Sequence, residues 1–436
     1  MSQSGDQLMI PSARRLMQSL RDIGYDAPSA IADLVDNSID ADARNINVSV
    51  AAEGKDSWVR VADDGAGMTG ARLDEAMRYG SSRSYGEEDL GAFGLGLKTA
   101  SLSQCRRLTV ASRTSGRGHI EVRRWDLDRV ARRDAWELQR LTPARCPRYL
   151  TEPLANGSGT VVLWENLDRV LDYARPDGQM AMRNLEGLTE EIGEHLAMVF
   201  HRFLSGELRK GRARIAITVN GAWLEPWDPF ARDETGTQEL PRQWLPLRHG
   251  GKTHRVGIRP YVLPNQVRFS SPEAHLVAGG PKRWNRQQGL YVYRRDRLIQ
   301  SGGWNRLRTS DEHSKLARVA VNIPPSADGL FRTNVSKMTV TLPAELRPAL
   351  RALASGVVAQ AQDAYRQRVR LVVAGEDVEE PRSTPAQQEW RLGDHWGRVV
   401  QVLEAELGDQ PELLRRVLVS LADPGSNEAP PVAASR

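Results

Sequence analysis

Acidic and amide side chains recur at helical spacing between residues 30 and 40. The four polar residues of this stretch, at positions i, i+3, i+4 and i+7, are Asp33, Asp36, Asn37 and Asp40. On a helix they share one face, opposite an apolar stripe. Such a face, taken alone, is usually a solvated polar surface. However, a carboxylate one turn from an amide can also activate a water while the amide oxygen binds a hard cation such as Mg²⁺. The neighbouring motifs decide between these alternatives.

A second motif, Asp63-Asp64-Gly65-Ala66-Gly67-Met68, follows an expected strand. An Asp at a strand end, followed by two spaced glycines, lets a flat ring approach the backbone while the carboxylate accepts an exocyclic amine hydrogen. A plain Asp-Gly turn is the alternative interpretation, because such turns are common. The motif alone is weak support for a binding site.

A third motif, GAFGLGLKT at residues 91–99, precedes an expected helix at 98–103. Glycines spaced in this way let backbone N–H groups wrap phosphate oxygens. The order G-x-x-G-x-G differs from both the P-loop and the dinucleotide-binding fingerprint. The two commonest nucleotide folds are therefore not supported.

A fourth motif, GSGTVVLW at residues 157–164, places Thr160 at the start of an expected strand. Its hydroxyl could hydrogen-bond a base or a bridging water. The alternative is a Thr chosen for strand propensity, which is the simpler explanation of this motif in isolation.

In this order and at these spacings, the four motifs resemble the ATP-binding signature of the GHKL superfamily, which includes DNA gyrase B, the ninety-kilodalton heat-shock chaperone, histidine kinases and MutL. AIADLVDNSIDA and GAFGLGLKTAS are most similar to MORC-type ATPases, including their bacterial relatives. The similarity continues at Ile217–Gly221, at Trp227–Phe230 and in GLYVYRRDRLI at 289–299, which resembles the transducer-like domain of those ATPases. It covers roughly residues 10–370.

The resemblance implies a role for each matching residue, with ATP and Mg²⁺ as the cofactors. Asn37 would coordinate Mg²⁺, and Asp63 would bind the adenine amino group with hydrogen-bonding support from Thr160. The other implied ATP-binding residues are Gly65, Gly67 and Met68 at the adenine, and Gly91, Gly94, Gly96, Leu97 and Lys98 at the phosphates.

The implied catalytic residues are Asp33 and Lys337. The family's general base is usually Glu, four residues before the Asn, and Asp33 is one methylene shorter. General-base catalysis is worth roughly 10²–10⁴-fold when its geometry is right, so we expect slow hydrolysis. Asp36 is a weaker candidate base. The family's second-domain lysine, which reaches the γ-phosphate, falls on Lys337, with Lys315 as the alternative.

Composition limits the class of protein. The chain has 436 residues, enough for two or three domains of roughly 100–200 residues. No run approaches the roughly 20 apolar residues of a membrane-spanning helix, and the N-terminus lacks a secretory signal. The two cysteines, Cys105 and Cys146, are too few for a disulfide framework or a four-ligand zinc site. We expect a reduced, cytoplasmic protein with no membrane contact.

The predicted elements favour an α/β fold, an α+β two-layer sandwich. Apolar periodicity predicts helices at 12–23, from Asp26 or Ser29 through Ile39, at 188–204 and at 344–372, and strands at 45–50, 58–62, 107–113, 119–125, 160–164, 213–219, 290–293 and 319–323. The expected domains are a GHKL-type ATP-binding domain (1–205), a transducer-like α/β domain (206–373), a linker (374–385), a small region of short C-terminal helices (386–422) and a disordered tail (423–436).

The basic excess of the chain is concentrated in one segment. The net charge is +5, yet residues 281–308 alone carry eight basic residues and one acid. Aromatic residues alternate with these cations, namely Trp284, Tyr291, Tyr293 and Trp304. Such a mixture suits nucleic-acid binding, because cations neutralise phosphates and rings stack on bases. Equally, Tyr291 and Tyr293 could be the core face of a strand.

The resemblance implies an ATP-gated dimeric clamp or switch. ATP would order the segment between Met68 and Lys98 and favour pairing of two nucleotide domains, which hydrolysis would release. The expected output is engagement of DNA, in repair, compaction or defence, with protein partners left open.

Two alternatives remain: a protein-remodelling chaperone of the same superfamily, and a non-hydrolysing ATP-sensing module in which Asp33 is vestigial. A histidine kinase is disfavoured because no His precedes His119, and type II topoisomerase activity because no cleavage domain follows.

Overall fold

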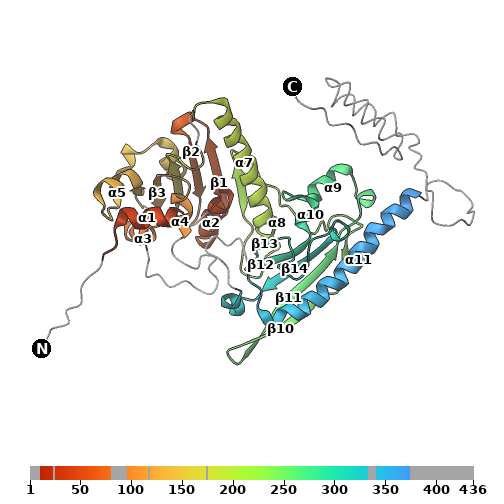
Figure 1. Ribbon diagram of the computed structural model, residues 1–436. Coiled ribbons are helices and arrows are strands. Elements are labelled where there is room, and N and C mark those ends of the chain that lie inside the picture. The colour runs from red at the N-terminus through yellow and green to blue at the C-terminus, as the bar shows by residue number, and fades with distance from the viewer. Residues whose placement is uncertain are drawn as a thin grey trace, which may run out of the picture. The chain divides into compact units, whose positions relative to one another are not determined.

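The computed structural model describes residues 10–22, 25–79, 96–115, 118–172, 175–331 and 340–373 (Figure 1). Two β-sheets with helices packed on them confirm the expected α/β class. The expected linker, short C-terminal helices and tail lie outside the described residues. None of the helices within the described ranges combines the length and apolar composition that crossing a membrane requires.

The first sheet has eight strands in the order β5-β4-β3-β6-β2-β1-β7-β8. Their bounds are β1 Asn45–Ala51, β2 Trp58–Asp63, β3 Arg107–Arg113, β4 Glu121–Asp126, β5 Gln139–Leu141, β6 Gly159–Glu165, β7 Ala216–Val219 and β8 Ala222–Trp223. All neighbours are antiparallel except β1 and β7, which run parallel.

The helices of the first half are α1 Ala13–Arg21, α2 Ala27–Asp40, α3 Gly70–Met77, α4 Gly96–Leu102, α5 Leu127–Arg133, α6 Arg148–Thr151, α7 Gln179–Val199 and α8 His201–Ser205. The expected helix starts at Ser12 and Asp26 are observed as N-caps. The Asp26 side chain accepts a hydrogen bond from the Ser29 amide at 2.7 Å, and Pro28 follows in the first turn. Asp26, and not Ser29, is therefore the N-cap residue of α2.

The first sheet separates two apolar layers. On one face Val162 and Trp164 of β6 pack with α2 and α7 in the main core, whereas Val161 and Leu163 face a smaller cluster beneath α6. This alternation follows from the two-residue period of a strand. The main helices thus lie on one face, which agrees with a two-layer arrangement.

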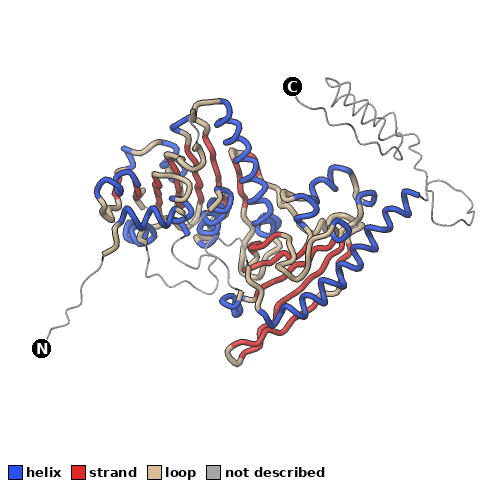
Figure 2. Tube along the Cα trace, viewed as in Figure 1, coloured by secondary structure: helices blue, strands red, loops and turns tan. Residues whose placement is uncertain are grey.

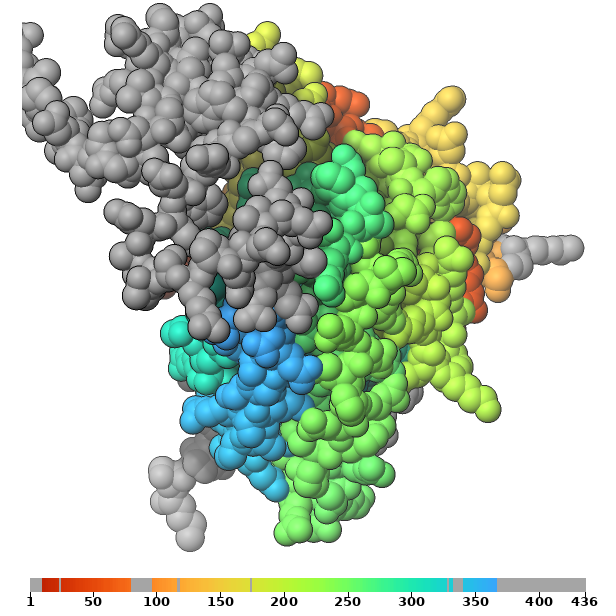
Figure 3. Space-filling view, turned by 90° about the vertical axis from the view of Figure 1, so that its right-hand side faces the viewer, coloured from red at the N-terminus to blue at the C-terminus, as the bar shows by residue number. Residues whose placement is uncertain are grey.

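The second sheet has six strands, in the order β10-β11-β14-β12-β13, with β9 paired to β11. Their bounds are β9 Gln238–Glu239, β10 Gln243–His249, β11 Lys252–Val262, β12 Gly289–Arg294, β13 Arg297–Ser301 and β14 Ala317–Ile323. The accompanying helices are α9 Pro272–Gly279, α10 Arg283–Gln287 and α11 Arg347–Val373. Helix α11 runs along this sheet (Figure 2), and its surface adjoins that of the β10–β11 region (Figure 3).

Several boundaries differ from the predictions. Residues 213–219 were expected to open the second α/β segment, but β7 and β8 hydrogen-bond to the first sheet through β1. The helix expected at 188–204 begins earlier and is divided at Phe200 into α7 and α8. Residues 344–346 form a 3₁₀ turn before α11. Strand pairing of β7 depends on partners about 170 residues away, which local periodicity does not reveal.

Candidate active site

The polar face of α2 is divided between buried and exposed side chains. Asp33 and Asp36 are 2% and 0% exposed, whereas Asn37 is exposed. The solvated-face interpretation is therefore wrong for the two carboxylates. Burying a carboxylate is costly unless it is paired or hydrogen-bonded, so each must have a specific environment.

Asp33 is held by contacts from two distant segments. The Tyr25 hydroxyl donates a hydrogen bond to its Oδ2 at 2.9 Å. The Arg297 guanidinium, from β13 in the second sheet, places Nη2 3.6 Å from Oδ1. Burial, reinforced by the Asp33 charge, raises the pKa of Tyr25, so the phenol remains a donor. A Cβ at Gly96 would lie 3.7 Å from Oδ2, which places the start of α4 beside this carboxylate.

Asp36 forms a buried ion pair with the same arginine. Arg297 Nε lies 2.8 Å from Asp36 Oδ1, and both side chains are buried. This pairing makes Asp36 a structural partner of the second sheet. Asp33 is therefore the better placed of the two predicted candidate bases.

Asp63 is a half-buried carboxylate whose two oxygens are fixed differently. Its Oδ1 accepts hydrogen bonds from the backbone amides of Gly65 at 2.9 Å and Thr160 at 3.1 Å. Its Oδ2 accepts one from the Ser38 hydroxyl at 2.9 Å. Burial raises the pKa of Asp63, and these hydrogen bonds oppose the rise. The predicted support from Thr160 is present, and it comes from the main chain.

The two glycines after Asp63 occupy positions that no side chain could share. Gly67 has φ +67°, and a Cβ there would lie 1.9 Å from the Arg113 carbonyl oxygen. A Cβ at Gly65 would lie 2.7 Å from the Ala41 carbonyl oxygen. The turn after β2 is therefore packed against the end of α2 and against β3. The approach of a flat ring to this backbone stays a prediction.

Ser112 on β3 connects the second and fourth motifs. The Met68 amide donates a hydrogen bond to its hydroxyl at 2.8 Å. That hydroxyl lies 2.9 Å from the Thr160 hydroxyl and donates to the Gly159 carbonyl at 2.9 Å. Met68 and Thr160 are thus brought together with Asp63 at one end of the first sheet.

Lys98 lies on α4 together with Gly96 and Leu97, and its ammonium is turned towards α3. Nζ donates a hydrogen bond to the Ala76 carbonyl at 2.9 Å. Burial lowers the pKa of Lys98 to about 8, partly opposed by the Glu75 charge. A contact of Lys98 with phosphate stays a prediction, because this conformation places its charge on α3.

Three predicted site residues, Gly91, Gly94 and Lys337, lie outside the described residues. The alternative lysine, Lys315, is half-buried; its ammonium pairs with Glu312 and lies 5.5 Å from the Tyr365 ring centroid. These contacts tie Lys315 to its own part of the second sheet.

Comparison with known proteins adds to this geometry. The family described as "Histidine kinase-, DNA gyrase B-, and HSP90-like ATPase" matches residues 25–160, the stretch that contains Asp33, Asp63 and Thr160. Over residues 25–160 the chain matches the GHKL ATPase family. The resemblance seen in the motifs is therefore confirmed.

Sequence relatives lie in two groups of this superfamily. The ATPase morc-1 of Caenorhabditis elegans is 33% identical over 88 residues, which are 20% of this chain and 10% of that protein. The DNA mismatch repair protein MutL of Anaeromyxobacter dehalogenans is 31% identical over 308 residues, 58% of this chain and 49% of that protein. MutL of Halobacterium salinarum is 37% identical over 100 residues, 22% of this chain and 15% of that protein. The chain thus matches about half, or less, of the length of these relatives.

The GHKL domain offers a single oxygen ligand for a metal on α2. Asn37 is exposed beside the buried Asp33, and its amide oxygen is the kind of donor that Mg²⁺ prefers. The described residues contain no cluster of three or more His, Cys, Asp or Glu side chains that could hold a metal. This donor set fits Mg²⁺, which is commonly bound by one or two protein ligands together with substrate phosphates.

The basic segment 281–308 is divided between buried and exposed side chains. Tyr291, Tyr293 and Trp304 are buried, so the core alternative for the two tyrosines is correct and these three rings cannot stack on bases. Arg294, Arg295 and Arg297 are buried as well. Trp284 is half-buried, and the remaining cations are half-buried or exposed, namely Lys282, Arg283, Arg286, Arg306 and Arg308. Contact of these residues with nucleic acid stays a prediction.

Four residues near the GHKL motifs were not predicted from the sequence: Tyr25, Ser38, Ser112 and Arg297. Ser38 lies one residue beyond Asn37 on α2, and its position facing Asp63 arises from the packing of α2 on the sheet. Arg297 belongs to the conspicuous basic segment, but its partners on α2 are 261 and 264 positions away in the chain. No local pattern indicates such a contact.

Proposed function

We propose that this chain binds ATP with Mg²⁺, hydrolyses it slowly, and uses the cycle to drive a dimeric clamp or switch that acts on DNA. The observation that carries the proposal is the half-buried Asp63 carboxylate, fixed by Ser38, Gly65 and Thr160 at the end of β2, within the residues that match the GHKL family. Its Oδ2 side is where the exocyclic amine of adenine would donate.

Asp33 is the proposed general base. It would accept a proton from the water that attacks the γ-phosphate, and Tyr25 and Arg297 hold its carboxylate in place. Asn37 would hold Mg²⁺, which when bound neutralises phosphate charge and orients the phosphates. The shorter Asp side chain reaches less far than Glu, which supports slow turnover.

The contact of Arg297 with α2 supports a switch. One guanidinium from β13 bridges the candidate base and Asp36, so a nucleotide that repositions α2 would act directly on the second sheet. A ligand shifts a conformational equilibrium only by binding one state more tightly than the other. We propose that ATP favours the paired state of two copies and that hydrolysis releases it.

The proposal of DNA as the target is supported by the relatives. The similar MutL proteins are DNA mismatch repair proteins, and the alignment with MutL of Anaeromyxobacter dehalogenans extends over 308 residues, more than the 136 residues (25–160) that match the GHKL family. Repair, compaction and defence against foreign DNA all fit an ATP-gated clamp.

Steady-state ATP turnover with Mg²⁺ tests the proposal, in the native chain and in Asp33→Asn, with and without duplex DNA. We expect slow turnover that DNA stimulates and that falls roughly 10²–10⁴-fold in Asp33→Asn. Asp233→Asn, the same change at an exposed carboxylate, is the matched control and should leave turnover unchanged. Equal turnover in the native chain and Asp33→Asn would refute Asp33 as the base.

One observation favours a second candidate, a non-hydrolysing ATP-sensing module. The Asp33 carboxylate already accepts a hydrogen bond from Tyr25 and lies beside Arg297, so its lone pairs are partly engaged. ATP binding by calorimetry with no turnover in either protein would establish this module and exclude the ATPase.

A further inference from the structure

A basic segment lies in the connection between α8 and β7, directly after Glu207. Residues 208–214 have the sequence LRKGRAR and contain Arg209, Lys210, Arg212 and Arg214. All four side chains are half-buried or exposed. The two ends of this segment line two different pockets, Arg214 the first and Arg209 the second.

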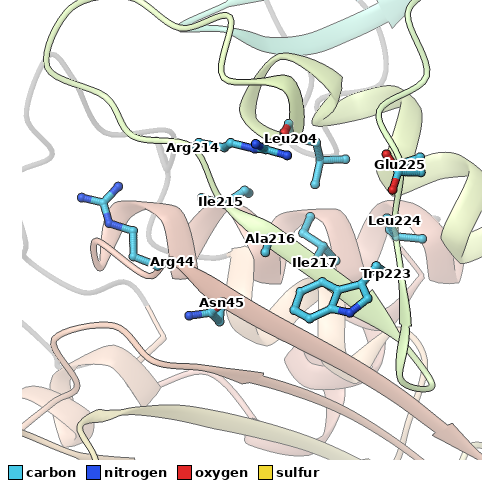
Figure 4. A pocket seen from close by; sticks show the side chains of 10 residues that line it. All are labelled: Arg44, Asn45, Leu204, Arg214, Ile215, Ala216, Ile217, Trp223, Leu224 and Glu225. Atoms are coloured by element: carbon cyan, nitrogen blue, oxygen red, sulfur yellow. Dashed lines mark hydrogen bonds between the residues drawn. The ribbon is translucent and has the colours of Figure 1, made fainter.

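The first pocket, of about 400 Å³, lies over β7 and β8 at the edge of the first sheet (Figure 4). Ile215 and Ile217 are among its lining residues, and Trp223 of the edge strand β8 forms one wall. The Trp223 residue is 66% exposed, although tryptophan is on average a highly buried residue type. An exposed indole beside a pocket is a stacking platform for a flat ring.

Two cations line the same pocket as this indole. Arg44 and Arg214 line the pocket, and the Arg214 Nε donates a hydrogen bond to the Leu204 carbonyl at 2.7 Å, which fixes its guanidinium. The one acid of the lining, Glu225, lies on the opposite side of the pocket from Arg44 (Figure 4). A ligand with a flat ring and a phosphate would therefore place the phosphate on the Arg44 side.

The second pocket, of about 280 Å³, continues the basic surface towards the second sheet. Its lining includes four arginines and two acids: Arg202, Arg209, Arg242, Arg259, Glu207 and Asp296. Both acids are shared by two arginines, Asp296 by Arg209 at 3.1 Å and Arg202 at 3.8 Å, and Glu207 by Arg232 at 2.7 Å and Arg259 at 3.8 Å. Trp244, 51% exposed, completes the wall, with the Arg255 guanidinium 5.2 Å from its ring centroid. Four arginines against two acids leave the lining of this second pocket net positive.

We propose that Trp223, Arg44, Arg214 and Lys210 form a binding site for single-stranded nucleic acid, with one base stacked on Trp223 and the backbone following segment 208–214. Stacking on an open indole needs an unpaired base, which favours a single strand over a duplex. The length of the basic surface favours an oligonucleotide over a mononucleotide. This inference rests on the proposed function only in taking nucleic acid as the partner, because none of these four residues is among those proposed to bind or hydrolyse ATP.

Fluorescence anisotropy with a labelled 15-nucleotide single strand, the matching duplex and AMP as competitor tests this site. We expect Trp223→Ala to weaken single-strand binding roughly 5- to 100-fold, and Trp223→Phe to weaken it less, since a ring remains. Arg44→Ala and Lys210→Ala should each reduce the slope of log affinity against log salt by about 0.7. The controls are Leu276→Ala, an exposed apolar residue, and Arg145→Ala, an exposed cation, which should bind normally.

Three results would overturn the proposal: unchanged single-strand affinity in Trp223→Ala, AMP competing as well as the oligonucleotide, or Trp223→Ala altering only the oligomeric state by light scattering. The last would make the β8 edge a contact between copies of this chain. ATP turnover is measured in the same variants and should equal that of the native chain. Absent turnover in the native chain together with Trp223-dependent strand binding would refute the ATPase and leave this site standing.

Discussion

Three neighbouring polar residues of α2 have three different environments. Asp33 faces Tyr25, Asp36 pairs with Arg297, and Asn37 is exposed. Their residue types alone allow either carboxylate to act as a base and any of the three to act as a ligand. Arg297 contacts both carboxylates, but it donates a 2.8 Å hydrogen bond to Asp36 and lies 3.6 Å from Asp33, so Asp36 is the more tightly paired of the two.

At the residue scale, Asp63→Asn should abolish most of the ATP affinity. Two backbone amides donate to Oδ1, so the Asn side chain would place its amide oxygen there and its NH₂ group towards the adenine amine, donor against donor. Losing a hydrogen bond to a charged group predicts roughly 10- to 100-fold weaker binding by calorimetry.

Asp64→Asn is the neighbouring control for this change. The Asp64 side chain accepts hydrogen bonds from the backbone amides of Arg44 and Asn45. The Asp64→Asn substitution should therefore leave the ATP affinity unchanged. Native-like affinity in Asp63→Asn would exclude Asp63 as the adenine-binding residue.

At the scale of elements, α2 and β13 are joined by one arginine. Arg297 compensates the charges of two buried carboxylates, so Arg297→Met should destabilise the chain by about 3–5 kcal/mol. Urea unfolding measures this, with Arg306→Met at an exposed position as the control. The double variant Arg297→Met, Asp36→Leu should recover part of the loss, since it removes a pair and not one partner. If the changes in the free energy of unfolding of the two single variants add up in the double variant, the two side chains are not coupled.

The turn between β2 and α3 gives a second element-scale prediction. Gly67→Ala combines a positive φ with a Cβ 1.9 Å from a carbonyl oxygen, whereas Gly211→Ala has φ +93° and no atom within 4 Å. Gly211→Ala should cost about 1 kcal/mol from backbone strain, and Gly67→Ala distinctly more, with loss of ATP binding. Thermal unfolding compares the two variants, and equal midpoints would exclude a close approach at Gly67.

At the scale of the whole molecule, a neutral histidine is buried where α8 meets the second sheet. The His201 Nε2 lies 2.9 Å from the Tyr293 hydroxyl. Burial lowers the pKa of His201 to about 3, with a further contribution from the Arg202 charge. The folded state therefore keeps this ring neutral at pH values where the unfolded chain takes up a proton.

The sign of the pH dependence follows from this lowered pKa. The neutral His201 ring stabilises the folded state fully at pH values above about 6.5, the pKa of histidine in the unfolded chain. This stabilisation is lost as the pH falls towards 3, the pKa of His201 in the folded state. Between pH 7 and 5 we expect a loss of about 2 kcal/mol from His201, by urea unfolding. His201→Gln should be less stable at pH 7 but should show a flatter profile, and an equally steep profile would assign the effect to other groups.

The local sequence determined much of this molecule. The four motifs, the caps at Ser12 and Asp26, and the strands at 45–50, 58–62 and 160–164 depend on residues a few positions apart, so periodicity and turn chemistry were enough to predict them. The positive φ of Gly67 is likewise a local property of its turn, whereas the lack of space for a side chain at Gly65 and Gly67 comes from Ala41 and Arg113.

The tertiary structure alone decided which of the polar residues are buried and which partners they have. Arg297 meets Asp36 across 261 positions, β7 joins the first sheet through β1, and Tyr291 and Tyr293 lie in a core while Trp223 lies at an edge. A charged or aromatic residue has the same local pattern in either environment. Only the packing of distant segments buries one such side chain and leaves another exposed to water. That difference in solvation determines which interactions each side chain can make.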